Sequence, residues 1–233
     1  MKILFRKQGI PYTGKYISRK IDAFGSSYNR CVLGVIDNSK NGLDKKVFYE
    51  NVAMLMPNFK MTRAGPFKGI RYSNGVVKDP KRKIRTCWEE IGHETVKLRN
   101  FLDGHKKGRA RVLVEIPRPA QEEVASGLWE MFKRLVSLCM GKNTLGLVAA
   151  SKVLFAVLPE VALPIDNAEW RTVFRTIDYG DIITQMAEEI TEWEKIVRTP
   201  LDSCDPYPLT TLPSVYNVMA MRARHQTKKP SML

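Results

Sequence analysis

The sequence predicts an α+β fold in which a basic, partly β N-terminal region packs on a C-terminal helical bundle. Residues 1–111 hold 25 Lys and Arg against 9 Asp and Glu, a net charge of +16, whereas residues 112–233 hold 13 against 15, a net −2. Short apolar runs fill the first region, and longer amphipathic stretches with capping residues fill the second. We therefore expect a basic β-containing region at 1–111, a helical domain at 112–221 and a basic tail at 222–233.

The strands are expected in the basic region. Residues 31–36 form an apolar run that is closed by Asp-Asn-Ser, which is typical of a strand followed by a turn. Residues 69–72 and 76–77 flank Asn74-Gly75, and the Asn-Gly pair predicts a hairpin with a type I′ turn. Residues 110–116 predict a further strand that ends at a proline.

The helices follow from apolar spacing and from residues that start or stop helices. Two are expected in the basic region, at 45–56 and 86–102. The second region predicts five more. They run from Pro119 to a stop at Gly141, from a cap at Asn143 or Thr144 over 145–158, over 167–176 behind an Asp166–Glu169 capping box, onward from Asp181, and from Pro213 to about 221. The apolar 145–158 helix should be central and largely buried.

Composition excludes several classes of protein. No apolar run approaches the ~20 residues that a membrane helix requires, and the apolar stretch near Met1 stops at Arg6, too soon for a signal peptide. We therefore expect an intracellular chain, cytoplasmic or in the nucleoid or nucleus, with no membrane partner. The four cysteines lie far apart and do not pair with the histidines in a zinc pattern. Simple thiols are expected, with no metal and no cofactor.

A dense group of cations points to nucleic acid. Cationic side chains neutralise phosphates, and aromatic faces stack on unpaired bases. The residues expected to contact nucleic acid are Arg63, Lys68, Arg71, Lys78, Lys81, Arg82, Lys83, Arg85 and Trp88. DNA is favoured over RNA as the partner, and phosphate contacts of this kind carry no base specificity. The alternative interpretation is a charged, solvated surface with no ligand.

The segment 141–175 combines a glycine, a Ser-Lys pair entering an apolar helix, a loop ending in Pro-Ile-Asp and a further helix. This order resembles the core of the helix-hairpin-helix DNA glycosylases. The resemblance covers about 35 of the 233 residues, and Val148 stands where the second glycine of the family's hairpin falls. It implies that Lys152 is the amine nucleophile or its neighbour and that Asp166 is the catalytic carboxylate.

The chemistry of such a pair is simple. A lysine amine can attack a sugar carbon, and a carboxylate can stabilise the positive charge that develops on the sugar. The target base must leave the duplex stack, and Trp170 is an aromatic that could stack on it. The structural alternative is an Asp166 that only caps a helix and a Lys152 whose ammonium reaches solvent past an apolar stem.

Two other functions stay open. A metal-dependent nuclease would use acidic residues at strand ends, such as Asp37, Asp44 and Glu115, although Pro117 occupies the position where the restriction-nuclease core carries a lysine. A non-catalytic RNA-binding or ribonucleoprotein component would need only the basic region. The Walker, dinucleotide and serine-hydrolase glycine motifs do not occur in the sequence.

Overall fold

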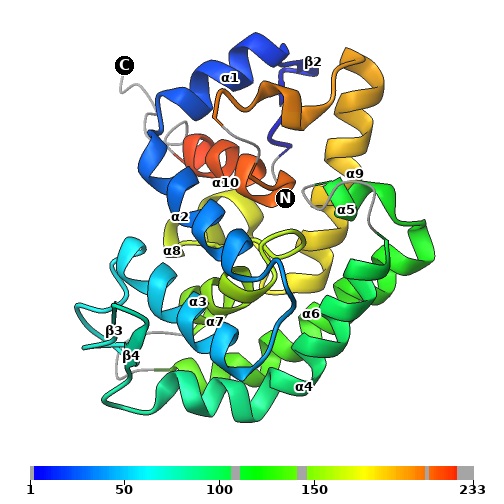
Figure 1. Cartoon of the computed structure of the whole chain (residues 1–233). Helices are drawn as coiled ribbons and strands as arrows, with labels where there is room; N and C mark the ends of the chain where they lie inside the picture. Colours follow the sequence, from blue (N-terminus) through cyan, green and yellow to red (C-terminus); the bar gives the residue numbers. More distant parts are fainter. Residues whose placement is uncertain (1–2, 106–110, 141–145, 208–209, 225–233) are drawn as a thin grey trace.

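The computed structural model of the chain is mostly helical, with two small antiparallel sheets (Figure 1). It describes residues 3–105, 111–140, 146–207 and 210–224. The elements before residue 106 are β1 (Arg6–Lys7), β2 (Ile10–Pro11), α1 (Gly14–Asp22), α2 (Ser26–Asn38), α3 (Lys45–Asn58), β3 (Arg71–Ser73), β4 (Val76–Lys78) and α4 (Lys83–Gly104). Those that follow are α5 (Val112–Glu115), α6 (Arg118–Cys139), α7 (Leu147–Val157), α8 (Asn167–Glu169), the π-helical η2 (Trp170–Phe174), α9 (Tyr179–Val197), the 3-10 helix η3 (Leu201–Cys204) and α10 (Leu212–Ala223).

The predicted hairpin is confirmed. Strands β3 and β4 pair in antiparallel register, with Tyr72 opposite Val77. Asn74 and Gly75 both have positive φ, 51° and 73°, which is the backbone that a type I′ turn requires. The hairpin lies at one edge of the molecule, beside α3 (Figure 1).

Two predicted strands are wrong. Residues 31–36 belong to α2, whose buried residues Asn29, Val32 and Val35 recur every three positions and face one side of a helix. Of the predicted strand 110–116, residue 110 lies outside the described residues, and residues 112–115 form the short helix α5, in which the adjacent residues Val112 and Leu113 are both buried. A short apolar run satisfies either structure, and packing decides between them.

Six of the seven predicted helices are confirmed, with shifted ends. The seventh, 167–176, is an α-helix only over 167–169 and continues as the π-helical η2 over 170–174. Helices α3 and α4 cover 45–56 and 86–102, α9 begins one half-turn before Asp181, and α10 starts at Leu212 behind a Thr211 cap. Asn143 and Thr144 lie outside the described residues, and Gly146 with φ 73° precedes α7. The tail 225–233 also lies outside them.

Helix α7 is the centre of the molecule, as expected. All its residues from Ala149 to Val157 are buried, and it packs against α6, α3 and α2. Helix α6 also packs along α4 and α9 (Figure 1). Near the N-terminus, the backbone N–H groups of Leu4 and Phe5 both donate to the Glu189 carboxylate on α9. Helix α1 packs against α10. One apolar core therefore contains residues from both sides of position 111.

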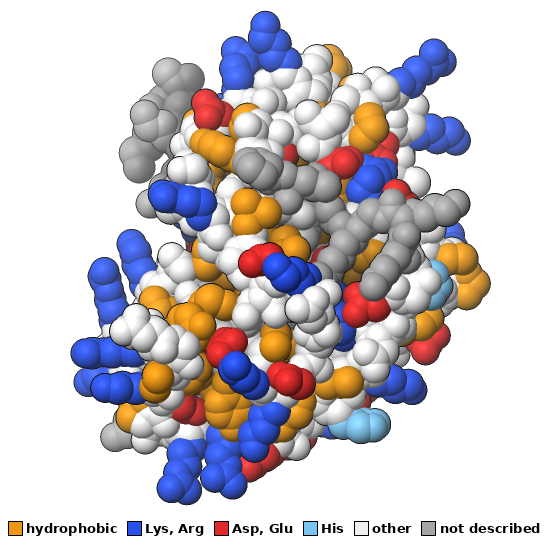
Figure 2. Space-filling model, in the orientation of Figure 1, with side chains coloured by type: hydrophobic (Ala, Val, Ile, Leu, Met, Phe, Trp, Pro, Cys, Tyr) orange, Lys and Arg blue, Asp and Glu red, His pale blue; other side chains and the backbone are white. Residues whose placement is uncertain are grey.

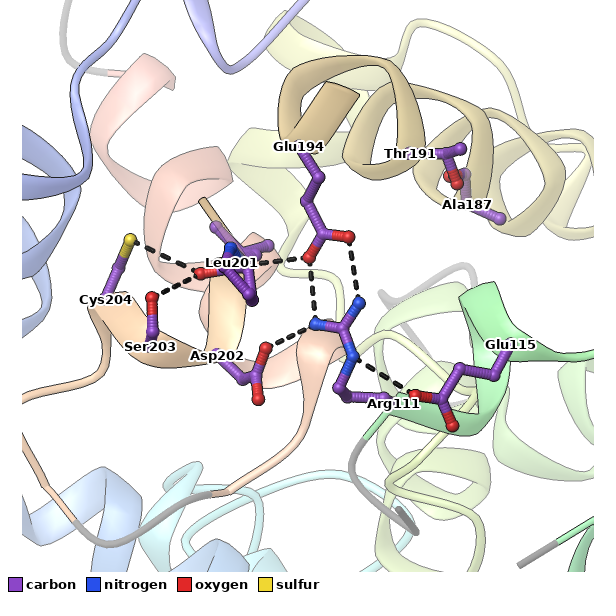
Figure 3. A network of polar contacts seen from close by, with 10 residues as sticks. Arg111, Glu115, Ala187, Thr191, Glu194, Leu201, Asp202, Ser203 and Cys204 are labelled. Carbon is purple, nitrogen blue, oxygen red and sulfur yellow. Dashed lines mark hydrogen bonds and ion pairs between the residues drawn. The ribbon is translucent and has the colours of Figure 1, made fainter. Parts of the chain in front are cut away.

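Arg111 ties three segments together. Its guanidinium donates to both carboxylate oxygens of Glu194, each at 2.9 Å, and also to Asp202 and to Glu115 (Figure 3). Glu194 in turn accepts the backbone N–H of Leu201, which fixes η3 to the end of α9. Among the described helices, none is both long and apolar enough to cross a membrane.

Candidate functional site

Lys152 and Asp166, which the sequence singled out, face each other in the structure. The Lys152 Nζ atom lies 2.5 Å from Asp166 Oδ1. Lys152 is only 2% exposed although it carries a charge, because α7 runs through the core. The Ser151 hydroxyl accepts the Ile165 N–H at 3.0 Å, so the residue before Lys152 holds the residue before Asp166 against α7. This bond fixes the spacing of the ion pair.

Asp166 also begins helix α8. Its backbone N–H donates to Glu169 Oε2 at 2.6 Å, and the two residues form the predicted capping box. Arg224, at the end of α10, places Nη1 3.8 Å from Asp166 Oδ2 and 3.4 Å from Glu169 Oε1. Burial raises the pKa of the Glu169 carboxyl to about 7, partly offset by its hydrogen bond from the Asp166 backbone. The helix cap at Asp166 therefore lies within a cluster of charged side chains, and capping a helix does not require such a cluster.

The ion pair lies in a pocket of about 370 Å³. This volume falls within the range of small-molecule sites in proteins. Aromatic rings, hydroxyl and amide groups, and both signs of charge line it. Its lining residues are Phe24, Ser27, Tyr28, Cys31, Asn58, Phe59, Lys60, Lys152, Pro164, Asp166, Asn217, Met221 and Arg224. They come from α2 and the residues just before it, the end of α3 and the residues just after it, α7, the loop before α8, and α10 with the residue that follows it.

The aromatic that the sequence offered for base stacking is not in this pocket. Trp170 is buried in the core, where its ring lies 5.7 Å from that of Phe132. Phe59 lines the pocket instead, and Lys152 Nζ lies 4.5 Å from the centroid of its ring. Tyr28 packs edge-on to Phe59 at 6.3 Å. Trp170 lies four residues after Asp166, at the start of the π-helical η2, and packing buries it outside the pocket lining.

Most of the predicted phosphate-contacting cations are exposed and belong to one stretch of surface. Lys60 borders the pocket and begins the loop that leads to the β3–β4 hairpin. Figure 2 shows a group of Lys and Arg side chains projecting from the edge that carries this hairpin in Figure 1. We call the exposed residues Lys60, Arg63, Lys68, Arg71, Lys78, Lys81 and Arg82 the cationic surface.

The hairpin places two of these cations side by side. Arg71 and Lys78 are direct partners in the β3–β4 register. Like charges opposite each other destabilise a strand pair, so this arrangement costs stability unless an anion lies over it. Lys81 Nζ donates to the Gly65 carbonyl at 3.0 Å, which joins the loop to the turn after β4.

Besides Lys81, three predicted contacts have structural partners, and we leave these three out of the cationic surface. Lys83 Nζ donates to the Leu138 carbonyl at the end of α6, and Arg85 pairs with Glu89 one helical turn away. Trp88 is half-buried, with its ring edge-on to Phe48 at 5.3 Å. The segment 78–83 connects β4 to α4 and is not an extended arm, because its Asp79 accepts the backbone N–H groups of residues 83–85 at the start of α4.

Other cations of the basic region are neutralised by the helical region. Arg99 is buried and its two Nη atoms donate to Glu160 at 3.0 and 2.6 Å. Arg111 is held by Glu194 and Asp202. The net charge of residues 1–111 is therefore larger than the charge that faces solvent. The cationic surface is the group of exposed cations that lie together.

Sequence reasoning missed the distal residues of the pocket. Tyr28, Asn217 and Arg224 lie far from Lys152 in the chain and carry no local motif. Within the part of the chain that the structure describes, no group of three or more His, Cys, Asp or Glu side chains is placed to hold a metal. Asp37 and Glu115, expected at strand ends, both lie in helices.

Comparisons with protein-family models, with curated proteins and with solved structures give no match to the chain. The candidate site therefore has to be interpreted from its own geometry.

Proposed function

We propose that the chain binds nucleic acid, with DNA favoured over RNA, and removes a base from its sugar in the pocket that holds Lys152 and Asp166. The observation that carries the proposal is the buried ammonium 2.5 Å from a carboxylate in a pocket with aromatic walls. Burying a charged group this deeply costs free energy, and buried ion pairs of this kind are common at functional sites.

The cationic surface supports the same function. It runs from Lys60 at the pocket rim to the hairpin, so a bound strand would have its phosphates beside the pocket mouth. We propose that the region 1–111 supplies this phosphate-facing surface and packs on the helical part 112–221, which supplies Lys152 and Asp166. An intracellular site of action follows from the partner, because nucleic acid is found there.

Lys152 and Asp166 can remove a base by nucleophilic attack on its sugar. Asp166 accepts a proton from the Lys152 ammonium, which leaves a lone pair on Nζ. That pair forms a bond to C1′ of the sugar while the bond from C1′ to the base breaks, and its electrons leave with the base. The base takes up the proton that Asp166 received, and one proton of the C1′-bound nitrogen passes to O4′ as the bond from C1′ to O4′ breaks, which leaves an iminium on Lys152. Water then adds to the iminium carbon, releases the abasic sugar as an aldehyde and restores the Lys152 ammonium.

The test is an excision assay on 5′-labelled duplexes that carry single uracil, hypoxanthine, 8-oxoguanine or alkylated purine residues. We expect alkali-labile sites to form in the presence of a chelator, and borohydride to trap a covalent protein–DNA adduct by reducing the iminium. Lys152→Met should abolish trapping, whereas Lys195→Gln on the exposed face of α9 should not.

Three outcomes would replace the proposal. Strand cleavage that a chelator abolishes would indicate a metal-dependent nuclease. Tight binding to RNA with no change to any substrate would indicate an RNA-binding component. Excision that persists in Lys152→Met would assign the chemistry elsewhere.

A further inference from the structure

Asn217 is a buried amide in the wall of the pocket. It is 2% exposed and projects from α10. Its Nδ2 group donates to the Tyr28 hydroxyl at 3.2 Å and lies 3.7 Å from Met221 Sδ. An amide nitrogen carries two hydrogens, so these two contacts use both of them. The carbonyl oxygen Oδ1 is then the group that Asn217 can offer to a ligand, as an acceptor.

Tyr28 offers the complementary group. Its hydroxyl oxygen accepts the Asn217 hydrogen, which leaves its own hydrogen to be donated. Burial raises the pKa of the Tyr28 hydroxyl above its ordinary value, so the hydrogen stays in place at physiological pH. The Tyr28 ring is fixed by stacking nearly parallel to Phe155 and by its edge contact with Phe24. Donor and acceptor are therefore held beside each other on rigid elements.

We propose that Tyr28 and Asn217 are specificity-determining residues that read one polar edge of a planar base, Tyr28 by donating a hydrogen bond and Asn217 Oδ1 by accepting one. The inference rests on the proposed function, and it names the part of the substrate that the pocket recognises. Buried polar groups that are built to pair with a ligand reject an otherwise identical ligand that leaves them unpaired. A base with one donor next to one acceptor meets this requirement, and an apolar isostere of the same shape does not.

The test measures binding separately from excision. The probes are fluorescein-labelled single-stranded DNA oligonucleotides whose central residue is uracil, hypoxanthine or the apolar thymine isostere 2,4-difluorotoluene. Single strands remove the cost of opening a duplex. We expect the wild-type protein to bind a hydrogen-bonding base about tenfold or more tightly than the isostere, since a good pair of such bonds discriminates by this order.

Tyr28→Phe keeps the ring and removes the donor, so it should reduce that ratio to about one. Tyr207→Phe is the matched control, because the Tyr207 hydroxyl bonds Asp22 outside the pocket. Asn217→Asp is an independent variant, since its carboxylate would take the Tyr28 hydrogen away from the ligand. Thermal melting establishes that each variant is folded.

The outcomes separate the two proposals. A ratio near one in the wild-type protein, or an equal ratio in wild type and Tyr28→Phe, overturns this inference even if bases are excised. A ratio that Tyr28→Phe abolishes upholds it even if no base is excised, in which case the proposed chemistry fails and the pocket is a base-binding site. Absence of binding to every oligonucleotide at low salt overturns both.

Discussion

Glu169 lies behind Asp166 with its Oε2 atom 2.6 Å from the Asp166 backbone nitrogen, so the carboxylate that faces Lys152 is oriented by a second, buried carboxyl. The same Glu169 carboxyl faces Arg224 across 3.4 Å. Two acidic side chains, Asp166 and Glu169, thus lie close to two basic ones, Lys152 and Arg224. The net charge of this cluster depends on pH because it depends on the protonation of Glu169.

Glu169→Gln should remove a pH dependence of stability. Burial raises the pKa of Glu169 from 4.5 to about 7, so between these values the folded state holds a proton that the unfolded state has lost. The contribution to the free energy of unfolding is therefore full below about pH 4.5, falls as the pH rises, and is lost above about pH 7. Relative to wild type, Glu169→Gln should gain up to about 3 kcal/mol between pH 5 and pH 8, measured by urea unfolding at both pH values. A difference that does not change with pH would contradict the assignment.

Asp166→Asn separates capping from charge. Asparagine caps a helix about as well as aspartate, so the substitution keeps the cap and changes the capping free energy little. Loss of the carboxylate leaves the buried Lys152 ammonium without its nearest charge partner, which should cost about 2–3 kcal/mol. Asp178→Asn at the start of α9 is the matched control and should stay within about 0.5 kcal/mol of wild type. Equal effects of the two substitutions on the free energy of unfolding would reduce Asp166 to a helix cap.

Arg111→Met tests whether the cations of the basic region hold the fold together. Its partners Glu194 and Asp202 are each less than about one-fifth exposed, so they would lose a charge partner in a poorly solvated place. We expect a loss of about 2 kcal/mol. Arg118→Met is the control, since Arg118 pairs with the exposed residues Glu122 and Glu188 and should cost at most about 0.5 kcal/mol. Chemical denaturation measures the free energy of unfolding of both variants. Similar decreases in the two would contradict a structural role for Arg111.

Neutralising the hairpin should weaken nucleic-acid binding and its dependence on salt. Each phosphate contact on duplex DNA contributes about −0.9 to the slope of log affinity against log salt. Arg71→Gln combined with Lys78→Gln should reduce the magnitude of that slope by about 1.8, measured by fluorescence anisotropy over a salt series. Lys195→Gln on α9 combined with Arg198→Gln just after it removes the same charge elsewhere and should leave the slope unchanged. Equal changes in the two double variants would indicate a net-charge effect rather than a surface.

The parts of the fold that local chemistry specifies could be predicted from the sequence. Asn74-Gly75 gave the hairpin because few other residue pairs adopt two consecutive positive φ angles. Pro119, Asp166 and Pro213 marked helix starts because capping and a missing N–H act within one turn. The apolar run 31–36 was misassigned because its helical face is completed by Asn29, whose burial depends on a hydrogen bond to Asp205.

The candidate site divides in the same way. Lys152 and Asp166 could be found because each belongs to a local pattern, a Ser-Lys pair entering an apolar helix and a Pro-Ile-Asp turn before the next helix. Trp170 and Trp88 were chosen by residue type alone, and packing buries the first and half-buries the second. Which cations face solvent could not be predicted either, since Arg99 and Arg111 pair with Glu160 and Glu194, which follow them by dozens of residues in the chain.

The sequence by itself determined that this chain is strongly basic before residue 112, that it has a hairpin around Asn74-Gly75, and that a lysine on an apolar helix is followed by a loop ending in Asp166. Only the tertiary structure decided that Tyr28, from the second helix, and Asn217, from the last, meet in the wall of one pocket with that pair. The physical reason is the distance along the sequence over which each kind of interaction acts. Backbone preferences act over a few residues, whereas a pocket is made by burying apolar faces that lie anywhere along the chain.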